Sequence, residues 1–140
     1  MNHTVADVIR HMLIDLAQGT LPSANGSWPI YAHNLPDTPD NAVVVYDTAG
    51  LLDGRSGADS VMEEHYGIEI MVRSSGVTGY TKADAIAVAM DTVQNVSVTV
   101  DTTSYVVHAI TRKSGVLKAG TETPTSKRYL FTVNAVVALT

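Results

Sequence analysis

The chain has 140 residues, which is the size of one domain that can bury its own hydrophobic core. Its formal net charge of -5 and its scattered basic residues argue against an extended cationic surface for nucleic acid. The absence of cysteine excludes disulfides, thiol nucleophiles and thiolate metal sites. Because no secretory signal pattern and no apolar run of about 20 residues is visible, we expect a soluble protein made in a cytoplasm, without a membrane partner.

The N-terminal part of the chain predicts one helix and two strands. Residues 4–18 have apolar side chains at helical spacing, with Thr4 as the N-terminal cap and Gly19 as the stop. Residues 28–32 predict a short edge strand, because Pro29 cannot donate a hydrogen bond to a central ladder. The unbroken apolar run at residues 42–46 predicts a strand that is buried on both faces.

The middle of the chain predicts a strand, a turn and a helix. Ile68, Ile70 and Val72 alternate with other residues over positions 66–73, which is typical of a strand with one face in the core. A helix is expected from Thr81, as its cap, to about residue 95. The predicted buried stripe of this helix consists of Ala83, Ile86, Ala87, Met90 and Val93.

Two stretches rich in glycine and polar residues, 47–60 and 114–126, predict long loops, which in compact domains are usually functional. Further strands are expected at residues 96–100, 105–112 and 129–139. The predicted fold is α+β: a single two-layer domain over residues 1–140, with two helices packed on a mixed, mainly antiparallel sheet of about five strands.

The segment around Asp47 is the one stretch with a catalytic pattern. An apolar strand followed by Asp-x-x-Gly is typical of GTPases, but the phosphate-binding loop that this chemistry requires is missing. The same run is close to the Asp-Thr-Gly signature of aspartic proteases, except that Ala49 stands in place of the glycine. The favoured interpretation is that Asp47 and Thr48 end a strand and start a turn. An Asp-dependent hydrolase remains an outside hypothesis.

No other catalytic, metal or cofactor site is predicted. The five histidines lack metal-ligand spacing on a helix, and no serine lies in a Gly-x-Ser-x-Gly elbow. Arg73, at the end of its predicted strand, is expected to pair with an acidic neighbour or with a partner subunit. Several aromatic residues border the predicted loops, where they suit either protein contacts or the edge of the core: Trp28, Tyr31, Tyr46, Tyr66 and Tyr80.

Several segments in this order resemble a known family. They are Trp-Pro-Ile-Tyr (residues 28–31), Ala-Val-Val-Val-Tyr-Asp-Thr (42–48), His-Tyr-Gly-Ile-Glu-Ile-Met-Val-Arg-Ser (65–74), Gly-Tyr-Thr-Lys-Ala (79–83) and Arg-Tyr-Leu-Phe-Thr-Val-Asn (128–134). The chain resembles neck and tail-completion proteins of tailed bacteriophages, which are often called minor capsid or tail terminator proteins. The resemblance runs along nearly the whole chain and implies an α/β fold, a hexameric ring and no catalytic residue.

The resemblance implies a structural virion protein at the head–tail junction, assembled in the host bacterial cytoplasm. Such a ring caps the tail tube, stops its polymerisation and joins the tail to the head connector, while genomic DNA passes through the lumen without specific binding. The alternative within this class is a head-closure or connector protein. The candidate subunit-interface residues are Asp47, Leu51, Leu52, Asp53, Arg55, Arg73, Tyr80, Val116, Leu117 and Lys118. The candidates for an acidic lumen are Asp37, Asp40, Asp53, Asp59, Glu63 and Glu64.

Overall fold

Two α-helices and seven β-strands make up the described part of the chain. The computed structural model describes residues 2–24, 26–56, 61–122 and 128–140, with the main chain alone for residues 50–56, 61–64 and 122. The elements in chain order are α1 (Val5–Asp15), the 3-10 turn η1 (Pro22–Ala24), β1 (Ile30–Ala32), β2 (Ala42–Ser56), β3 (Val61–Ser74), α2 (Thr78–Asp91), β4 (Gln94–Val100), β5 (Thr103–Arg112), β6 (Leu117–Glu122) and β7 (Arg128–Leu139). None of the helices in these ranges is long and apolar enough to cross a membrane.

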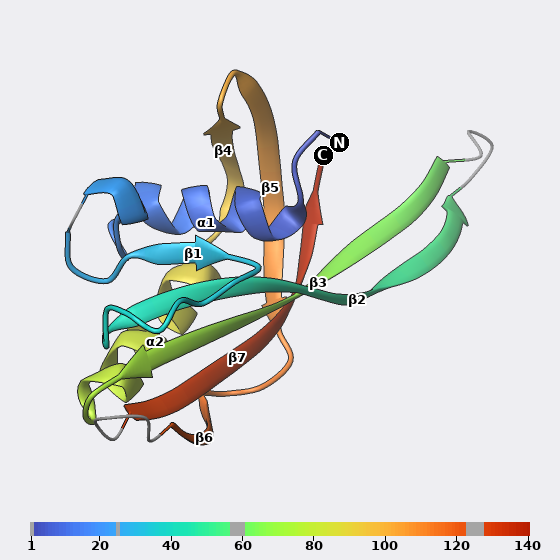
Figure 1. Cartoon of the computed structure of the whole chain (residues 1–140). Helices are drawn as coiled ribbons and strands as arrows, with labels where there is room; N and C mark the ends of the chain where they lie inside the picture. The colour runs from blue at the N-terminus through green and yellow to red at the C-terminus, as the bar shows by residue number, and fades with distance from the viewer. Residues whose placement is uncertain (1, 25, 57–60, 123–127) are drawn as a thin grey trace.

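All seven strands belong to one sheet. Their order is β1-β2-β3-β7-β5-β4, and β6 pairs with β7 beside the point where β5 ends. Only the β1–β2 pair is parallel among the described strands. The sheet curls into a half-barrel, and α1 lies across its open side (Figure 1).

The predicted two-layer fold with about five strands is wrong, because the sheet has more strands and is strongly curled. Two stretches expected to be loops are strands instead: β2 continues through residues 47–56, and residues 117–122 form β6. Asp47 and Thr48 therefore do not end a strand. Residues 57–60 and 123–127, the remaining parts of those predicted loops, lie outside the described residues. The curl follows from the right-handed twist of the strands, which accumulates across the seven strands and along the longest of them, β2, β3 and β7.

The hydrophobic core lies between the concave face of the sheet and the two helices. Period-two alternation places Val43, Val45, Ile68, Ile70 and Val72 on this face, and all five are buried. Fully burying a side chain of this size contributes roughly 1.5–3 kcal/mol relative to leaving it exposed. Four residues of the predicted stripe, Ala83, Ile86, Ala87 and Met90, lie on α2 in this core cluster. Val93 is also in the cluster, but it follows the helix, which ends at Asp91 and not near residue 95 as predicted.

The ends of the helices differ in part from the prediction. Thr4 does cap α1, because its hydroxyl accepts the Asp7 main-chain N–H at 3.2 Å. The helix ends at Asp15, before the predicted stop at Gly19. Ala17, which follows the C-terminal cap Leu16, takes a left-handed conformation with φ of 60°. The predicted cap of α2 is wrong, since the helix begins at Thr78 with Val77 before it and no side-chain cap. Gly79 allows this earlier start, because a Cβ there would lie 2.2 Å from Oγ of Ser74.

Candidate functional site

The outer halves of β2 and β3 leave the body of the protein as a two-stranded arm, residues 49–56 and 61–65 (Figure 1). β1 pairs with β2 only at residues 43–45, and β7 pairs with β3 only from Tyr66 onward. Over the described arm residues, the two strands therefore pair with each other and with no third strand. An isolated two-stranded ribbon is marginally stable in water, and its two open edges present unpaired main-chain groups.

Gly67 marks the root of the arm. It pairs with Thr48, and the register between the two strands shifts just beyond, between Thr48 and Leu51. A Cβ at position 67 would lie 2.4 Å from both the Ala49 carbonyl oxygen and the Thr48 Oγ1. Only glycine permits this close approach of the two strands where the arm bends away from the body.

The arm contains four of the predicted interface residues, Leu51, Leu52, Asp53 and Arg55. The structure describes their main chain in β2 but not their side chains. The predicted lumen residues Glu63 and Glu64 lie on the facing strand, and Asp59 falls in the undescribed tip. Asp37 and Asp40 are exposed in the loop before β2. The sequence predicted a contact loop in this stretch, whereas the structure has the paired strands of the arm there.

The remaining interface candidates divide between surface and core. Tyr80 is 51% exposed and packs its ring edge against Phe131, and Leu117 is 54% exposed. Lys118 lies over the ring of Tyr129, with 5.0 Å between Nζ and the ring centre. Val116, in contrast, is partly buried against the core. Of the aromatic residues at predicted loop margins, Trp28 and Tyr66 also pack on the core, so Tyr80 is the one that suits a contact best.

Arg73 is buried rather than exposed, with 1% of its surface accessible. Its Nη2 donates to the Pro39 carbonyl oxygen at 2.6 Å, and its Nε donates to the Asp40 carbonyl oxygen at 3.4 Å. The guanidinium therefore holds the loop before β2 against β3 in its own chain. This role could not be inferred from sequence, because the loop and the strand are more than 30 positions apart.

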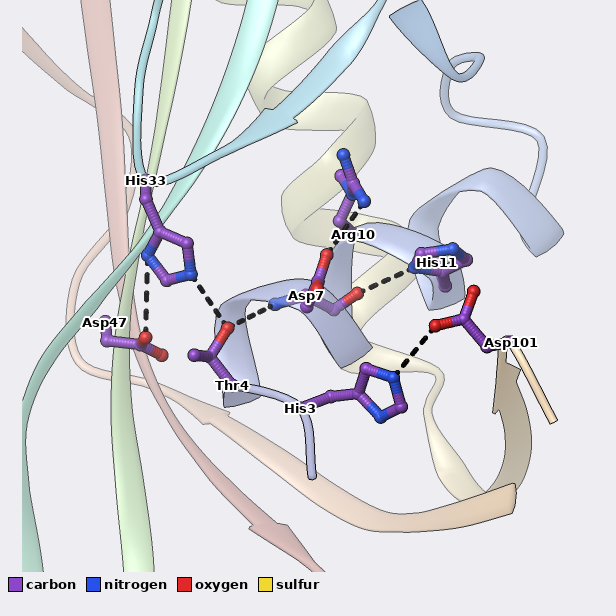
Figure 2. A network of polar contacts seen from close by, with 8 residues as sticks. All are labelled: His3, Thr4, Asp7, Arg10, His11, His33, Asp47 and Asp101. Atoms are coloured by element: carbon purple, nitrogen blue, oxygen red, sulfur yellow. Dashed lines mark hydrogen bonds and ion pairs between the residues drawn. The ribbon is translucent and has the colours of Figure 1, made fainter. Parts of the chain in front are cut away.

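A network of polar contacts surrounds the start of α1 (Figure 2). Asp47, where β2 leaves the core, accepts the Ala6 main-chain N–H on Oδ1 at 2.9 Å. Its Oδ2 lies 3.6 Å from Nδ1 of His33, and Nε2 of His33 lies 2.8 Å from Oγ1 of Thr4. A carboxylate at this end of a helix is stabilised by the unpaired N–H groups and by the helix dipole. Asp47 therefore serves as a helix cap that is supplied by a strand.

A second histidine fastens the same end of α1 to the other side of the sheet. Nδ1 of His3 lies 2.8 Å from the Tyr105 hydroxyl on β5, and Nε2 lies 3.1 Å from Oδ2 of Asp101 in the β4–β5 turn. The helix is thus joined to β2 by Asp47 and to the β4–β5 hairpin by His3. These contacts span the open side of the half-barrel.

Thr4, His33 and Asp47 also follow the order of nucleophile, base and carboxylate in nucleophilic hydrolases. Two observations favour the structural role. Oγ1 of Thr4 is already the acceptor that caps α1, and 3.6 Å between His33 and Asp47 is longer than a hydrogen bond. Neither His33 nor Thr4 stood out in the sequence as a catalytic residue, because the residues meet only through the packing of α1 on the sheet.

The pKa values of Arg112 and Lys82 are shifted. The hydrogen bonds to Asp91, at 2.8 and 2.7 Å, raise the pKa of Arg112, which lines a groove of about 590 Å³ at the end of β5. Burial lowers the pKa of Lys82, whose Nζ lies 5.9 Å from the centre of the Trp28 ring. Because Asp91 pairs with Arg112, this arginine is a compensated charge, and Lys113 is the further cation that lines the groove.

No protein-family model matches the sequence, and no curated protein has significant sequence similarity to it. Among the solved structures that are similar, one of a protein that carries no functional name has a TM-score of 0.42 and 15% sequence identity. The similarity covers 96% of this chain and 96% of that chain. A similarity of this size assigns neither a family nor a function.

Proposed function

We propose that this chain is a structural virion protein of a tailed bacteriophage, a subunit of a homo-oligomeric ring at the head–tail junction. In this proposal the ring, a hexamer by the family resemblance, caps the tail tube, stops its polymerisation and joins the tail to the head. Its partners are copies of itself, the tail tube protein and the head connector, and DNA passes through its lumen. The ring is assembled in the host cytoplasm and works through contact surfaces, without catalysis, metal or cofactor.

The observation that carries this proposal is the β2–β3 arm. A ribbon without a third strand gains stability when its edges or faces are covered by another chain. The arm continues the two longest strands of the sheet, β2 and β3. A force that a neighbouring subunit exerts on the arm is therefore transmitted along these strands to the core. A projecting, rigidly rooted element of this kind suits a subunit that holds neighbours in an assembly.

The exposed face of α2 supports the same proposal. Val77, Tyr80 and Val88 are 81%, 51% and 55% exposed, although they are large apolar residues on or directly beside one helix. Apolar side chains gathered in this way are typical of contact surfaces. The acidic balance of the chain, with a net charge of -5, suits a channel along which a phosphate backbone slides without binding.

The test is complementation in the phage that encodes this protein. Particles made without it are expected to have overlong or unjoined tails in negative stain, and the intact chain is expected to restore normal particles. A chain whose arm is shortened, with residues 52–64 replaced by Asn-Gly between Leu51 and His65, is expected to fold but not to restore them. Purified virions that contain no copies of the chain would refute the proposal.

The particles made without the chain separate the two structural roles, and one variant tests the hydrolase hypothesis. Tails of normal length on heads that leak DNA would favour the head-closure or connector role. For the hydrolase hypothesis, Asp47→Asn is the deciding variant. The asparagine side chain keeps an oxygen for the Ala6 N–H, so a structural protein should still assemble, whereas an enzyme that depends on the carboxylate would lose its activity.

A further inference from the structure

Strand β4 forms one open end of the sheet, because β5 is the one described strand that pairs with it. On β5, the main-chain N–H and C=O of Val106 both bond to Thr140, each at 3.0 Å. Val106 therefore directs its main-chain groups away from β4. Since successive residues of a strand direct these groups to opposite sides, Tyr105 and Val107 direct theirs toward β4.

The open edge of β4 is formed by Ser97 and Thr99. The valines that alternate with them lie opposite Tyr105 and Val107 in the register and make the hydrogen bonds to β5. The same valines point their side chains into the core, on the side of the sheet where α1 packs. The main-chain N–H and C=O groups of Ser97 and Thr99 therefore point out of the sheet edge, and the side chains of both residues are exposed.

The other described edges of the body have features that hinder the addition of a strand. β1 is three residues long, follows Pro29 and lies beside the loop at residues 36–41. The buried guanidinium groups of Arg73 and Arg128 hold that loop through its main-chain carbonyl oxygens. β6 is interrupted by a register shift and carries charged residues. Residues 96–100 of β4, in contrast, include no charge and no proline, and their pairing with β5 has no shift.

The β3 strand of the arm is an open edge of the same length. Its residues 61–65 pair with β2 on one side, and β7 joins the other side only from Tyr66 onward. The register between the arm strands shifts twice, and each time β2 contains the extra residue, so β3 is the regular strand of the two. Because a bulge hinders further pairing at an edge, the β3 side of the arm is the one that another strand can join.

We propose that residues 61–65 of one copy pair with residues 96–100 of a second copy, so that the sheet of one subunit continues into the next. Within one chain, β7 and β5 separate β3 from β4, and the arm and β4 lie on opposite sides of the body (Figure 1). Each of the two edges lacks the strand that the other supplies, which is why the partner is a second copy. One arm and one edge per copy give the head-to-tail arrangement that generates rings. This inference rests on the proposed function and names the main-chain surfaces through which the ring closes.

Because the chain contains no cysteine, disulfide cross-linking can map this pairing. A Ser97→Cys chain is mixed, under mild oxidation, with chains that carry one cysteine at each position from 61 to 65 in turn. Side chains of paired strands alternate between the two faces, so the yield of mixed disulfide is expected to alternate with period two, the favoured positions exceeding their neighbours by about tenfold. Ser104→Cys is the control and is expected to give no such pattern, because Ser104 is an equally exposed serine on the same face but one strand further from the edge.

Blocking the open edge provides the second measurement, by sedimentation of the full chain. Ser97→Pro removes an N–H that points away from β5, so thermal unfolding is expected to show an intact fold. Self-association is expected to weaken by about tenfold, since the added strand loses a hydrogen bond and meets the proline ring. Ser97→Lys, which places a charge at the edge and leaves the main chain unchanged, is expected to act in the same direction. Ser104→Lys adds the same charge one strand further in and is expected to assemble as the unmodified chain does.

The outcomes separate this contact from the proposed function. Rings that form normally from both Ser97 variants, with no alternation in the cross-links, would overturn the contact and leave the ring intact. Homodimers of the Ser97→Cys chain in excess over the mixed disulfides would show that two β4 edges pair with each other, and would overturn the arm as the partner. Alternating cross-links in a chain that is absent from virions would support the contact and reject the virion role. A chain that stays monomeric and shows no alternating cross-link would reject both.

Discussion

The inner and outer halves of the β2–β3 hairpin belong to the same two strands but have different surroundings. In the inner half, Val43 and Val45 pair with Val72 and Ile70, lie under α1 and have further strands on both sides. In the outer half, the two strands pair only with each other over the described residues. The two strands thus pair along the whole hairpin, with register shifts in the outer half, whereas further strands flank only the inner half of the described residues. The comparison shows that one pair of strands can be fixed in the core at its inner end and still present its outer end for contact with another chain.

The largest difference is expected from apolar truncations in the two halves. Ile70→Ala, at a position that is 1% exposed between Val45 and Val133, is expected to lower the free energy of unfolding by about 2–5 kcal/mol. Leu52→Ala, in the outer half, is expected to cost less than about 1 kcal/mol. Urea unfolding of both variants measures the two values. Equal losses would mean that the arm belongs to the core.

The second prediction concerns the cation that holds the 36–41 loop to the inner half. Arg73→Met removes the donor to the Pro39 and Asp40 carbonyl oxygens, and we expect a loss of about 3 kcal/mol because these acceptors lose their partner. Arg112→Met is the matched control, since its exposed pair with Asp91 should contribute little. Thermal unfolding compares the two. If the control proved as costly as Arg73→Met, burial would not be the reason for the effect.

The third prediction addresses the junction between the two halves. Gly67→Ala places a Cβ 2.4 Å from the Ala49 carbonyl oxygen, so the strands must move apart, at an expected cost of about 1–3 kcal/mol. Hydrogen exchange should localise the loss of protection to the root of the arm. Gly115→Ala, whose Cβ would meet nothing within 4 Å, is the control. Unchanged protection around Thr48 would contradict the role assigned to Gly67.

A smaller effect is expected at the cap that the inner half supplies to α1. Asp47→Ala removes the acceptor of the Ala6 N–H, and we expect a loss of about 1 kcal/mol, as for other helix caps. Asp47→Asn should lose less, because it keeps the oxygen and gives up only the charge. Urea unfolding at low salt ranks the two variants. The reverse order would mean that the cap is not the role of this carboxylate.

The smallest effect on folding is expected from shortening the arm itself. Replacing residues 52–64 by Asn-Gly, a sequence that favours tight hairpin turns, should change the free energy of unfolding by less than about 1 kcal/mol. The same variant is expected to fail in phage assembly. A large loss of stability would show that the arm is packed on the body, and the distinction between the two halves would then not hold.

Patterning of apolar residues was enough to locate most elements. The alternation in residues 66–73 and the small-residue stripe of α2 both predicted the faces that are buried. The composition of residues 47–56 misled the prediction, because glycine and aspartate usually mark loops and a strand without a core has no apolar alternation to reveal it. The network around Asp47 and His33 could not be predicted, since its members come from three separate segments.

The sequence by itself determined the local structure: where the chain alternates with period two or has a stripe at helical spacing, it forms a strand or helix with that face inward. The tertiary structure alone decided that the strands curl into a half-barrel, that Arg73 and Arg128 lie beneath the 36–41 loop, and that β2 and β3 continue past the core. The physical reason is that twist accumulates over the whole sheet, and that a buried charge or a strand edge is defined by neighbours distant in sequence.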